Sequence, residues 1–261
     1  MTETPPEPLV SVHHDGGVAT VLLERPKVNA LSIALLDELS AVLEALHREP
    51  PGALVLSGGR RLFAAGAEIS ELAVADRAPA LIAALARASR LLAELPRVTF
   101  AAVNGVAFGG GLELALACDL RLVARDVRLA LPEIHLGIFP GGGGTQRLAR
   151  LVGVARAKEL IFTGREVHAE EALAIGLADQ VHEPDQLLAA AQSFAAQFAR
   201  GPLVALQLAK RAIDTGLDLG IEDGLALERE LFARALSSED ARIGMASFFA
   251  NGPGHAEFSG K

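Results

Sequence analysis

The chain is organised around the segment Gly105-Val-Ala-Phe-Gly-Gly-Gly-Leu-Glu113-Leu-Ala-Leu-Ala-Cys118, which leads from a strand into a helix. The strand is expected at Thr99–Val103 and the helix at Leu112–Cys118. A helix that is apolar on every side belongs in the protein core. Backbone amides at a helix start lack partners, and glycines let another group approach them. The segment therefore predicts either an oxyanion-binding helix start or a tight strand-to-helix turn.

Strands and helices alternate on either side of this segment. The β-prone runs Leu9–His13 and Val18–Leu23 flank Asp15-Gly-Gly17, which is typical of a hairpin. Apolar residues recur at helical spacing over Leu31–Leu46, and Ser32 is placed to cap that helix. We further expect strands at Ala53–Leu56 and Leu120–Val123 and a helix at Pro79–Leu95.

The pattern from Thr145 onward is almost wholly helical. Strands followed by helices predict an α/β core with a helical C-terminal region. We expect a disordered lead at residues 1–8, a core at residues 9–200 and a helical region at residues 201–261. The expected helices are Gln146–Leu151, Ala155–Phe162, Ala169–Ile175, Pro184–Arg200, Pro202–Thr215, Ile221–Leu236 and Glu239–Phe249.

Length and composition indicate a globular chain and exclude several classes of protein. The 261 residues carry a formal net charge of −8, so the chain lacks the basic stripe of a nucleic-acid-binding protein. No apolar run is long enough to cross a bilayer, and the single Cys118 excludes a Cys-rich metal site. Residues 1–8 do not resemble a signal peptide. We therefore expect a cytoplasmic protein with no nucleic-acid or membrane partner.

Two glutamates, Glu113 and Glu133, each stand alone in an apolar stretch. Removing a carboxylate from water is costly unless it is paired, hydrogen-bonded or protonated. Neither glutamate has a Lys or Arg at helical spacing that would neutralise its charge. Two carboxylates in one apolar pocket can divide proton donation and proton abstraction between them. The alternative is a pair of structural glutamates that are hydrogen-bonded to backbone amides.

Two other loops consist of small residues. The loop Phe63-Ala-Ala-Gly-Ala67-Glu68 follows a strand, and its amides would supply a second oxyanion donor. The loop Gly141-Gly-Gly-Gly144 lacks the ending of a phosphate-binding P-loop, so it predicts a flexible turn and a helix start. The seven histidines show no metal-ligand spacing, and no Gly-x-Ser-x-Gly elbow is present. We expect neither a metal site nor a hydrolase triad.

Motifs of one enzyme family follow one another along nearly the whole chain from about residue 9. They are Arg25-Pro-Lys-Val-Asn29-Ala-Leu31, Phe63-Ala-Ala-Gly-Ala-Glu-Ile69, Ala102-Val-Asn-Gly105, Gly109-Gly-Gly-Leu-Glu113-Leu-Ala-Leu-Ala-Cys-Asp119, Pro132-Glu-Ile134, Leu136-Gly-Ile-Phe-Pro-Gly141, Gly143-Gly-Thr-Gln-Arg-Leu148, Phe162-Thr-Gly164 and Glu239-Asp-Ala-Arg-Ile-Gly-Met-Ala-Ser-Phe248. With these motifs the chain resembles the enoyl-CoA hydratase/isomerase (crotonase) superfamily, and within it the enoyl-CoA hydratases.

The resemblance implies a spiral of ββα units with a helical trimerisation region, assembled as a homotrimer or a dimer of trimers. It implies an acyl-CoA thioester substrate and no cofactor, since coenzyme A is part of the substrate. It implies that the amides of Ala67 and Gly110 form an oxyanion hole for the thioester carbonyl. Glu133 would deliver a proton to the α-carbon, and Glu113 would activate the water that attacks the β-carbon. The implied substrate contacts are Lys27, Ala65, Glu68, Ile69, Phe108 and Gly109.

Three departures from the family pattern concern details of substrate binding. Ser70 stands where the family often has a basic residue near coenzyme A, and Ala250-Asn-Gly-Pro-Gly254 replaces a basic stretch. Leu131 stands where hydratases often carry a polar residue. Both glutamates are present, which favours water addition. An enoyl-CoA isomerase or another enolate-forming enzyme is the alternative, followed by a silent acyl-CoA-binding protein; acyl chain length and pathway stay open.

Overall fold

The computed structural model describes residues 8–261, so the predicted lead at residues 1–8 lies outside the description except for Pro8. A six-stranded sheet forms its centre, in the order β1-β2-β3-β4-β6-β9. The β1–β2 pair is the predicted antiparallel hairpin, and every other pair in this sheet is parallel. These strands are β1 (Val10–Asp15), β2 (Val18–Leu23), β3 (Ala53–Ser57), β4 (Val98–Val103), β6 (Leu120–Ala124) and β9 (Gln180–His182).

A second, three-stranded sheet has the order β5-β7-β8, with β5 (Val106–Phe108), β7 (Arg128–Ala130) and β8 (Val167–His168). An isolated parallel bridge between Ala64 and Ala107 places the segment around Ala64 beside the strand β5 of this sheet. Successive turns of the chain thus add a strand to the large sheet, a short strand or bridge to the small sheet, and a helix. This is the ββα repeat that the resemblance implies.

The short strands correct one prediction. The chain after Thr145 was predicted to be almost wholly helical, yet β8 and β9 lie there. Strands of two or three residues are too short to show the alternation of apolar and polar side chains on which strand prediction depends. β5 and β7 were missed for the same reason.

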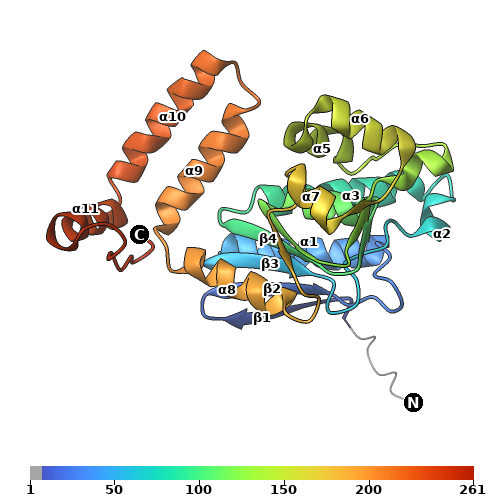
Figure 1. The fold of residues 1–261 in the computed structure, drawn as a ribbon, viewed down its shortest axis with the longest axis horizontal. Coiled ribbons are helices and arrows are strands. Elements are labelled where there is room, and N and C mark those ends of the chain that lie inside the picture. Colours follow the sequence, from blue (N-terminus) through green and yellow to red (C-terminus); the bar gives the residue numbers. More distant parts are fainter. Residues whose placement is uncertain (1–7) are drawn as a thin grey trace.

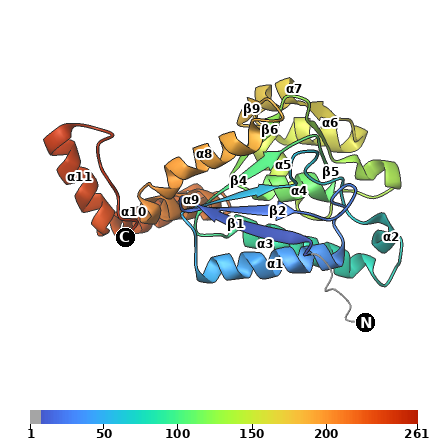
Figure 2. The same ribbon diagram turned by 90° about the horizontal axis from the view of Figure 1, so that it is seen from below.

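Helices cover both faces of the large sheet (Figure 2). On one face lie α1 (Ile33–Arg48) and α3 (Ala78–Ala93), and the predicted Ser32 cap of α1 is confirmed because its side chain accepts from the Leu35 amide. On the other face lies α8 (Leu187–Ala199), where the rings of Phe194 and Phe198 pack against Phe100.

The helix α4 (Gly110–Ala117) is buried along its entire length, as predicted. It packs against α3, the helix α5 (Gly144–Val152) and the strand β5 of the small sheet, so it carries the residues around Glu113 into the core. The remaining elements of this part are α2 (Ile69–Leu72), the 3-10 helix η1 (Pro132–Leu136), α6 (Val154–Thr163) and α7 (Ala169–Ala174).

The C-terminal helices α9 (Leu203–Gly216), α10 (Ile221–Leu236) and α11 (Glu239–Asn251) extend away from this core (Figure 1). The Lys210 ammonium on α9 contacts the Asp119 carboxylate at 2.9 Å and ties α9 to the core. Among residues 8–261, no helix combines the length and apolar character needed to cross a bilayer. Several large apolar side chains of these helices are exposed: Ile213, Leu217, Ile221, Phe232, Leu236, Phe248 and Phe249.

Candidate active site

Two backbone amides, those of Ala67 and Gly110, lie side by side at the start of α4. A Cβ on Gly110 would stand 3.7 Å from the Ala67 nitrogen. Within residues 8–261 neither amide has a backbone acceptor, whereas Glu68 donates to Leu31 and Gly109 donates to Ala130. Paired free N–H groups at a helix start stabilise a developing oxyanion. The structure therefore brings the two predicted donors together.

Glycines let other groups approach the start of α4 closely. Gly109 has φ of +49°, and a Cβ on it would lie 2.9 Å from Oε1 of Glu133. A Cβ on Gly111 would lie 2.4 Å from the carbonyl oxygen of Ala64. Any other residue at either position would collide with the carboxylate or with the neighbouring backbone, so these glycines fix the spacing of the site.

The Glu113 carboxylate is the most deeply buried acid of the site, with 2% of the residue exposed. Its Oε1 accepts hydrogen bonds from the amides of Gly142 at 2.7 Å and Gly144 at 2.8 Å. Burial raises the pKa of Glu113, while these two amides and the positive charge of Arg147 oppose the rise. Backbone amides of the Gly142–Gly144 loop thus hold this carboxyl in place.

The loop Gly141–Gly144 therefore does more than was predicted for it. The predicted helix start is confirmed, because α5 begins at Gly144. The sequence interpretation did not detect that the same loop binds the Glu113 carboxylate. The only signal is the run of glycines itself, since the contact joins residues that are far apart in the chain.

Glu133 lies in η1 and has a different environment. Within the described residues, its buried Oε2 atom has no hydrogen-bond partner. Burial raises the pKa of Glu133 to about 7, and the negative charge of Glu113 adds to the rise. The environment thus favours the proton on Glu133 over Glu113, and two acids whose environments separate their pKa values are suited to opposite proton-transfer roles.

The segments that carry the predicted substrate contacts are hydrogen-bonded to one another. The Ala65 amide donates to the Val28 carbonyl at 3.0 Å, so the segment that bears Lys27 runs beside the segment that bears Ala67. The side chain of Ile69 is half exposed. Phe108 lies on β5, with its carbonyl oxygen 3.2 Å from the place of a Cβ on Gly66.

Glu68 is engaged within the protein. Its carboxylate accepts from the amide and hydroxyl of Ser70 and pairs with Arg25 at 2.8 Å. These hydrogen bonds from Ser70 and from Arg25 lower the pKa of Glu68. Its contact with substrate stays a prediction, as do those of Lys27, Ala65, Ile69, Phe108 and Gly109.

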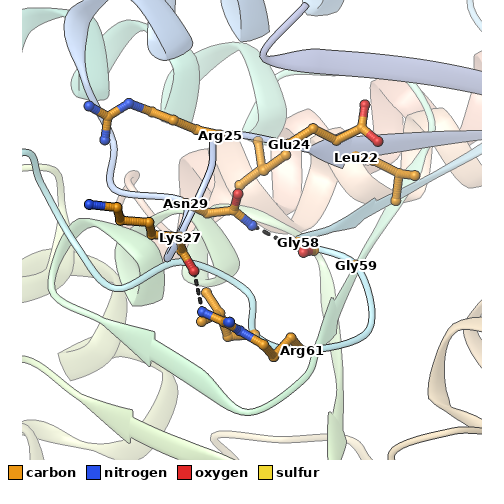
Figure 3. A pocket seen from close by; sticks show the side chains of 10 residues that line it. Leu22, Glu24, Arg25, Lys27, Asn29, Gly58, Gly59 and Arg61 are labelled. Atoms are coloured by element: carbon orange, nitrogen blue, oxygen red, sulfur yellow. Dashed lines mark hydrogen bonds between the residues drawn. The ribbon is translucent and has the colours of Figure 1, made fainter. Parts of the chain in front are cut away.

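A cavity of about 260 Å³, here called the basic cavity, opens beside Lys27 (Figure 3). The Arg61 guanidinium donates to the Lys27 carbonyl, and Asn29 Nδ2 donates to the Gly58 carbonyl at 3.0 Å. Arg61 was not among the predicted site residues, because its place beside Lys27 results from a contact between segments that are distant in the sequence. The lining residues are Leu22, Leu23, Glu24, Arg25, Lys27, Asn29, Gly58, Gly59, Arg61 and Leu62.

Metal-ligating side chains do not gather in the described part of the chain: no three His, Cys, Asp or Glu residues converge there. Leu131, one of the departures from the family pattern, is buried, with Cδ1 3.1 Å from the place of a Cβ on Gly144. Its hydrocarbon side chain packs beside Gly144, in the loop whose amides bind the Glu113 carboxylate.

Comparison with known proteins gives one consistent result. The enoyl-CoA hydratase/isomerase family model matches residues 13–257. The short-chain-enoyl-CoA hydratase of Clostridium acetobutylicum is 40% identical over 246 residues, covering 92% of this chain and 94% of that protein. The crystal structure of an enoyl-CoA hydratase from Bacillus anthracis superposes with a TM-score of 0.92 at 36% identity, covering 97% of this chain and 100% of that one. The crystal structure of an enoyl-CoA hydratase subunit from Geobacillus kaustophilus superposes with a TM-score of 0.90 at 37% identity, covering 97% of this chain and 98% of that one.

Proposed function

The chain belongs to the enoyl-CoA hydratase/isomerase family and is a hydro-lyase of the enoyl-CoA hydratase type, and we propose that Glu113 and Glu133 together add water to a 2-enoyl-CoA thioester. The observation that carries this proposal is the pairing of two free amides, at Ala67 and Gly110, with two buried carboxyls in different environments. An acyl-CoA supplies the carbonyl that such a site stabilises.

The oxyanion hole stabilises the negative charge that develops on the thioester oxygen. The thioester carbonyl oxygen lies between the amides of Ala67 and Gly110 and gains negative charge as water attacks the conjugated double bond. Loss of one such donor costs roughly 3–4 kcal/mol of transition-state stabilisation. The start of α4 adds its positive end to the same point.

The two glutamates divide the proton transfers. The water oxygen forms a bond to the β-carbon, and its proton passes to Glu113. The electron pair of the double bond moves to the α-carbon, which takes a proton from the Glu133 carboxylic acid. The hydrogen bonds to Glu113 and the unpartnered oxygen of Glu133 support this order, because they favour the charge on the first and the proton on the second. Dehydration follows the same path in reverse.

Water addition is tested on the wild-type protein with 2-enoyl-CoA thioesters whose acyl chains range from about C4 to about C16. We expect the conjugated thioester absorbance to fall and the 3-hydroxyacyl-CoA to appear. Conversion of a 3-enoyl-CoA into a 2-enoyl-CoA without hydration would support the isomerase alternative. Binding without turnover would support a silent acyl-CoA-binding protein, and either result would contradict the proposal.

The basic cavity is our proposed site for the phosphate groups of coenzyme A. Lys27 and Arg61 are among the residues that line it (Figure 3), and the Lys27 segment runs beside the oxyanion loop. The family's basic residue is absent at Ser70, and Arg61 offers a guanidinium that matches phosphate geometry.

The assembly is our proposal as well. The exposed apolar side chains of α9 to α11 form a surface that a monomer rarely leaves open to water. A homotrimer, or a dimer of trimers, would cover this surface with copies of the same chain. A cytoplasmic location, which the sequence pattern predicts, completes the proposal. Independence from cofactors and a part in fatty acid β-oxidation are also proposed, and these two rest on the resemblance.

A further inference from the structure

Arg147 has no part in the mechanism described so far, although it lies directly beneath the Glu113 loop. It stands in the first turn of α5, and its guanidinium Nη1 donates to the Gly142 carbonyl at 3.1 Å. A Cβ on Gly143 would lie 2.1 Å from the same nitrogen. The guanidinium therefore fills the place where any other residue at position 143 would put its side chain.

Both polar backbone groups of Gly142, the amide and the carbonyl, make hydrogen bonds to side chains of the site. Its amide donates to Glu113, and its carbonyl accepts from Arg147. Gly143, which follows, has φ of +115°, a conformation that glycine adopts at low cost because it has no Cβ. Arg147 thus fixes the loop geometry on which the two hydrogen bonds to the Glu113 carboxylate depend.

Arg147 also contributes charge. The charged side chains that act on Glu113 within residues 8–261 are Arg147 from α5 and Glu133 from η1. The neighbouring Cys118 thiol, whose pKa is raised to about 12 by burial, is neutral near pH 7. Burial lowers the pKa of Arg147 itself and Glu113 opposes that change, yet an arginine keeps its proton in proteins. Arg147 is therefore the one cation that offsets the burial of the Glu113 carboxylate in the described part of the chain.

We propose that Arg147 is a positioning residue for water addition, which holds the Gly142–Gly144 loop on Glu113 and places a positive charge beside that carboxylate. The inference rests on the proposed function, in which Glu113 accepts the proton of the attacking water. It is more specific than a structural role at a helix start, because it requires the charge of the side chain as well as its hydrogen bond.

The test compares four variants of the full-length protein. Arg147→Gln and Arg147→Met remove the charge, and Arg147→Lys retains it. Arg150→Gln is the matched control, because Arg150 lies on the same helix but is exposed and contacts Gln146 and Asp218. Circular dichroism first confirms that each variant is folded, and the two neutral variants guard against a failure of either one to fold.

Two readouts follow. The pH profile of kcat for crotonyl-CoA hydration reports the ionisation that catalysis needs, and infrared difference titration follows the carboxyl band that Glu113→Gln removes. In the neutral variants we expect both midpoints to move upward by about one pH unit, because a nearby opposite charge lowers a carboxyl pKa by roughly one to three units. We expect Arg147→Lys to stay near the wild-type midpoints and Arg150→Gln to match them.

Unchanged midpoints in a folded neutral variant would overturn the inference, as would an equal shift in Arg150→Gln. Failure of the proposed function has a different signature, since wild-type protein would then hydrate no 2-enoyl-CoA. In that case the infrared titration, which needs no turnover, still shows whether Arg147 controls the ionisation of Glu113.

Discussion

The amide of Gly144 donates a 2.8 Å hydrogen bond to Oε1 of Glu113, which lies 31 positions earlier in the chain. This contact joins the start of α5 to the first turn of α4, and the Gly142 amide adds a second bond to the same oxygen. The proposed base is thus oriented by backbone from another turn of the fold. Its position depends on a loop that has no room for side chains.

The lack of room gives a direct prediction for Gly142. A Cβ there would lie 2.5 Å from Leu85 Cδ2 and 2.7 Å from Oε2 of Glu113, so Gly142→Ala displaces the loop or the carboxylate. We expect kcat for hydration to fall by roughly tenfold or more, since misplacement of about 1 Å can cost two orders of magnitude. Gly141→Ala is the control, because its Cβ would meet only Ile82, at an ordinary 3.6 Å. Equal activity of the two variants would contradict the described geometry.

The raised pKa of Glu133 predicts a dependence of stability on pH. The pKa of Glu133 is about 7 in the folded protein, whereas the unfolded chain releases this proton near the ordinary glutamate pKa of 4.5. The stabilising contribution of this proton is therefore complete below the lower pKa and is lost as the pH rises through the higher one. Compared with Glu133→Gln, the wild type should lose resistance to urea between pH 4.5 and 7. Parallel urea midpoints of the two proteins across this range would refute the assignment.

Arg61 is predicted to act on the coenzyme A end of the substrate alone. Arg61→Gln should raise KM for crotonyl-CoA by about tenfold, which corresponds to the loss of one charged hydrogen bond of roughly 1.5 kcal/mol. The KM for crotonyl-pantetheine, which lacks the nucleotide, should be unchanged. Arg60→Gln, next in sequence but outside the cavity lining, is the control. If KM rises for both thioesters, Arg61 acts on the shared part of the substrate and the phosphate proposal is wrong.

Asp240 is predicted to fasten the C-terminal tail. It is buried at the start of α11 and accepts hydrogen bonds from the amides of Ser259 and Gly260 and from the Ser259 hydroxyl. Asp240→Ala leaves these donors without their acceptor and should cost about 2–4 kcal/mol, within the range for a buried hydrogen-bonded network. Limited proteolysis should then cleave the last residues faster than in the exposed control Glu239→Gln. Equal cleavage rates would show that the tail is held by other contacts.

Most long elements and both proposed acids could be predicted from the sequence, because their signals lie within short stretches of the chain. Helices such as Ile221–Leu236 extend over several turns, so their apolar spacing identifies them without knowledge of the fold. Glu113 and Glu133 were conspicuous because each interrupts an apolar run with a group that is costly to bury.

The missed features are non-local. The strands β5, β7, β8 and β9 have two or three residues each, and their pairing partners come from other turns of the chain. The hydrogen bonds from the Gly142–Gly144 loop to Glu113 and the place of Arg61 beside Lys27 likewise join distant segments. No periodicity records such contacts, so they become visible only in the folded chain.

The division of roles between the two glutamates is the central claim, and α-proton exchange tests it directly. Butyryl-CoA has no double bond to hydrate, so exchange of its α-protons with deuterated water needs only the oxyanion hole and Glu133, whose carboxylate takes the α-proton as a base and whose acid form returns a deuteron. We compare exchange with crotonyl-CoA hydration in Glu113→Gln, Glu133→Gln and the exposed control Glu183→Gln.

Hydration should fall by at least about a hundredfold in both active-site variants, since acid–base groups contribute roughly 10²–10⁴. Exchange should survive in Glu113→Gln and be lost in Glu133→Gln, while Glu183→Gln behaves as wild type. Loss of exchange in Glu113→Gln with retention in Glu133→Gln would reverse the roles. Undiminished hydration in either active-site variant would contradict the two-glutamate mechanism itself.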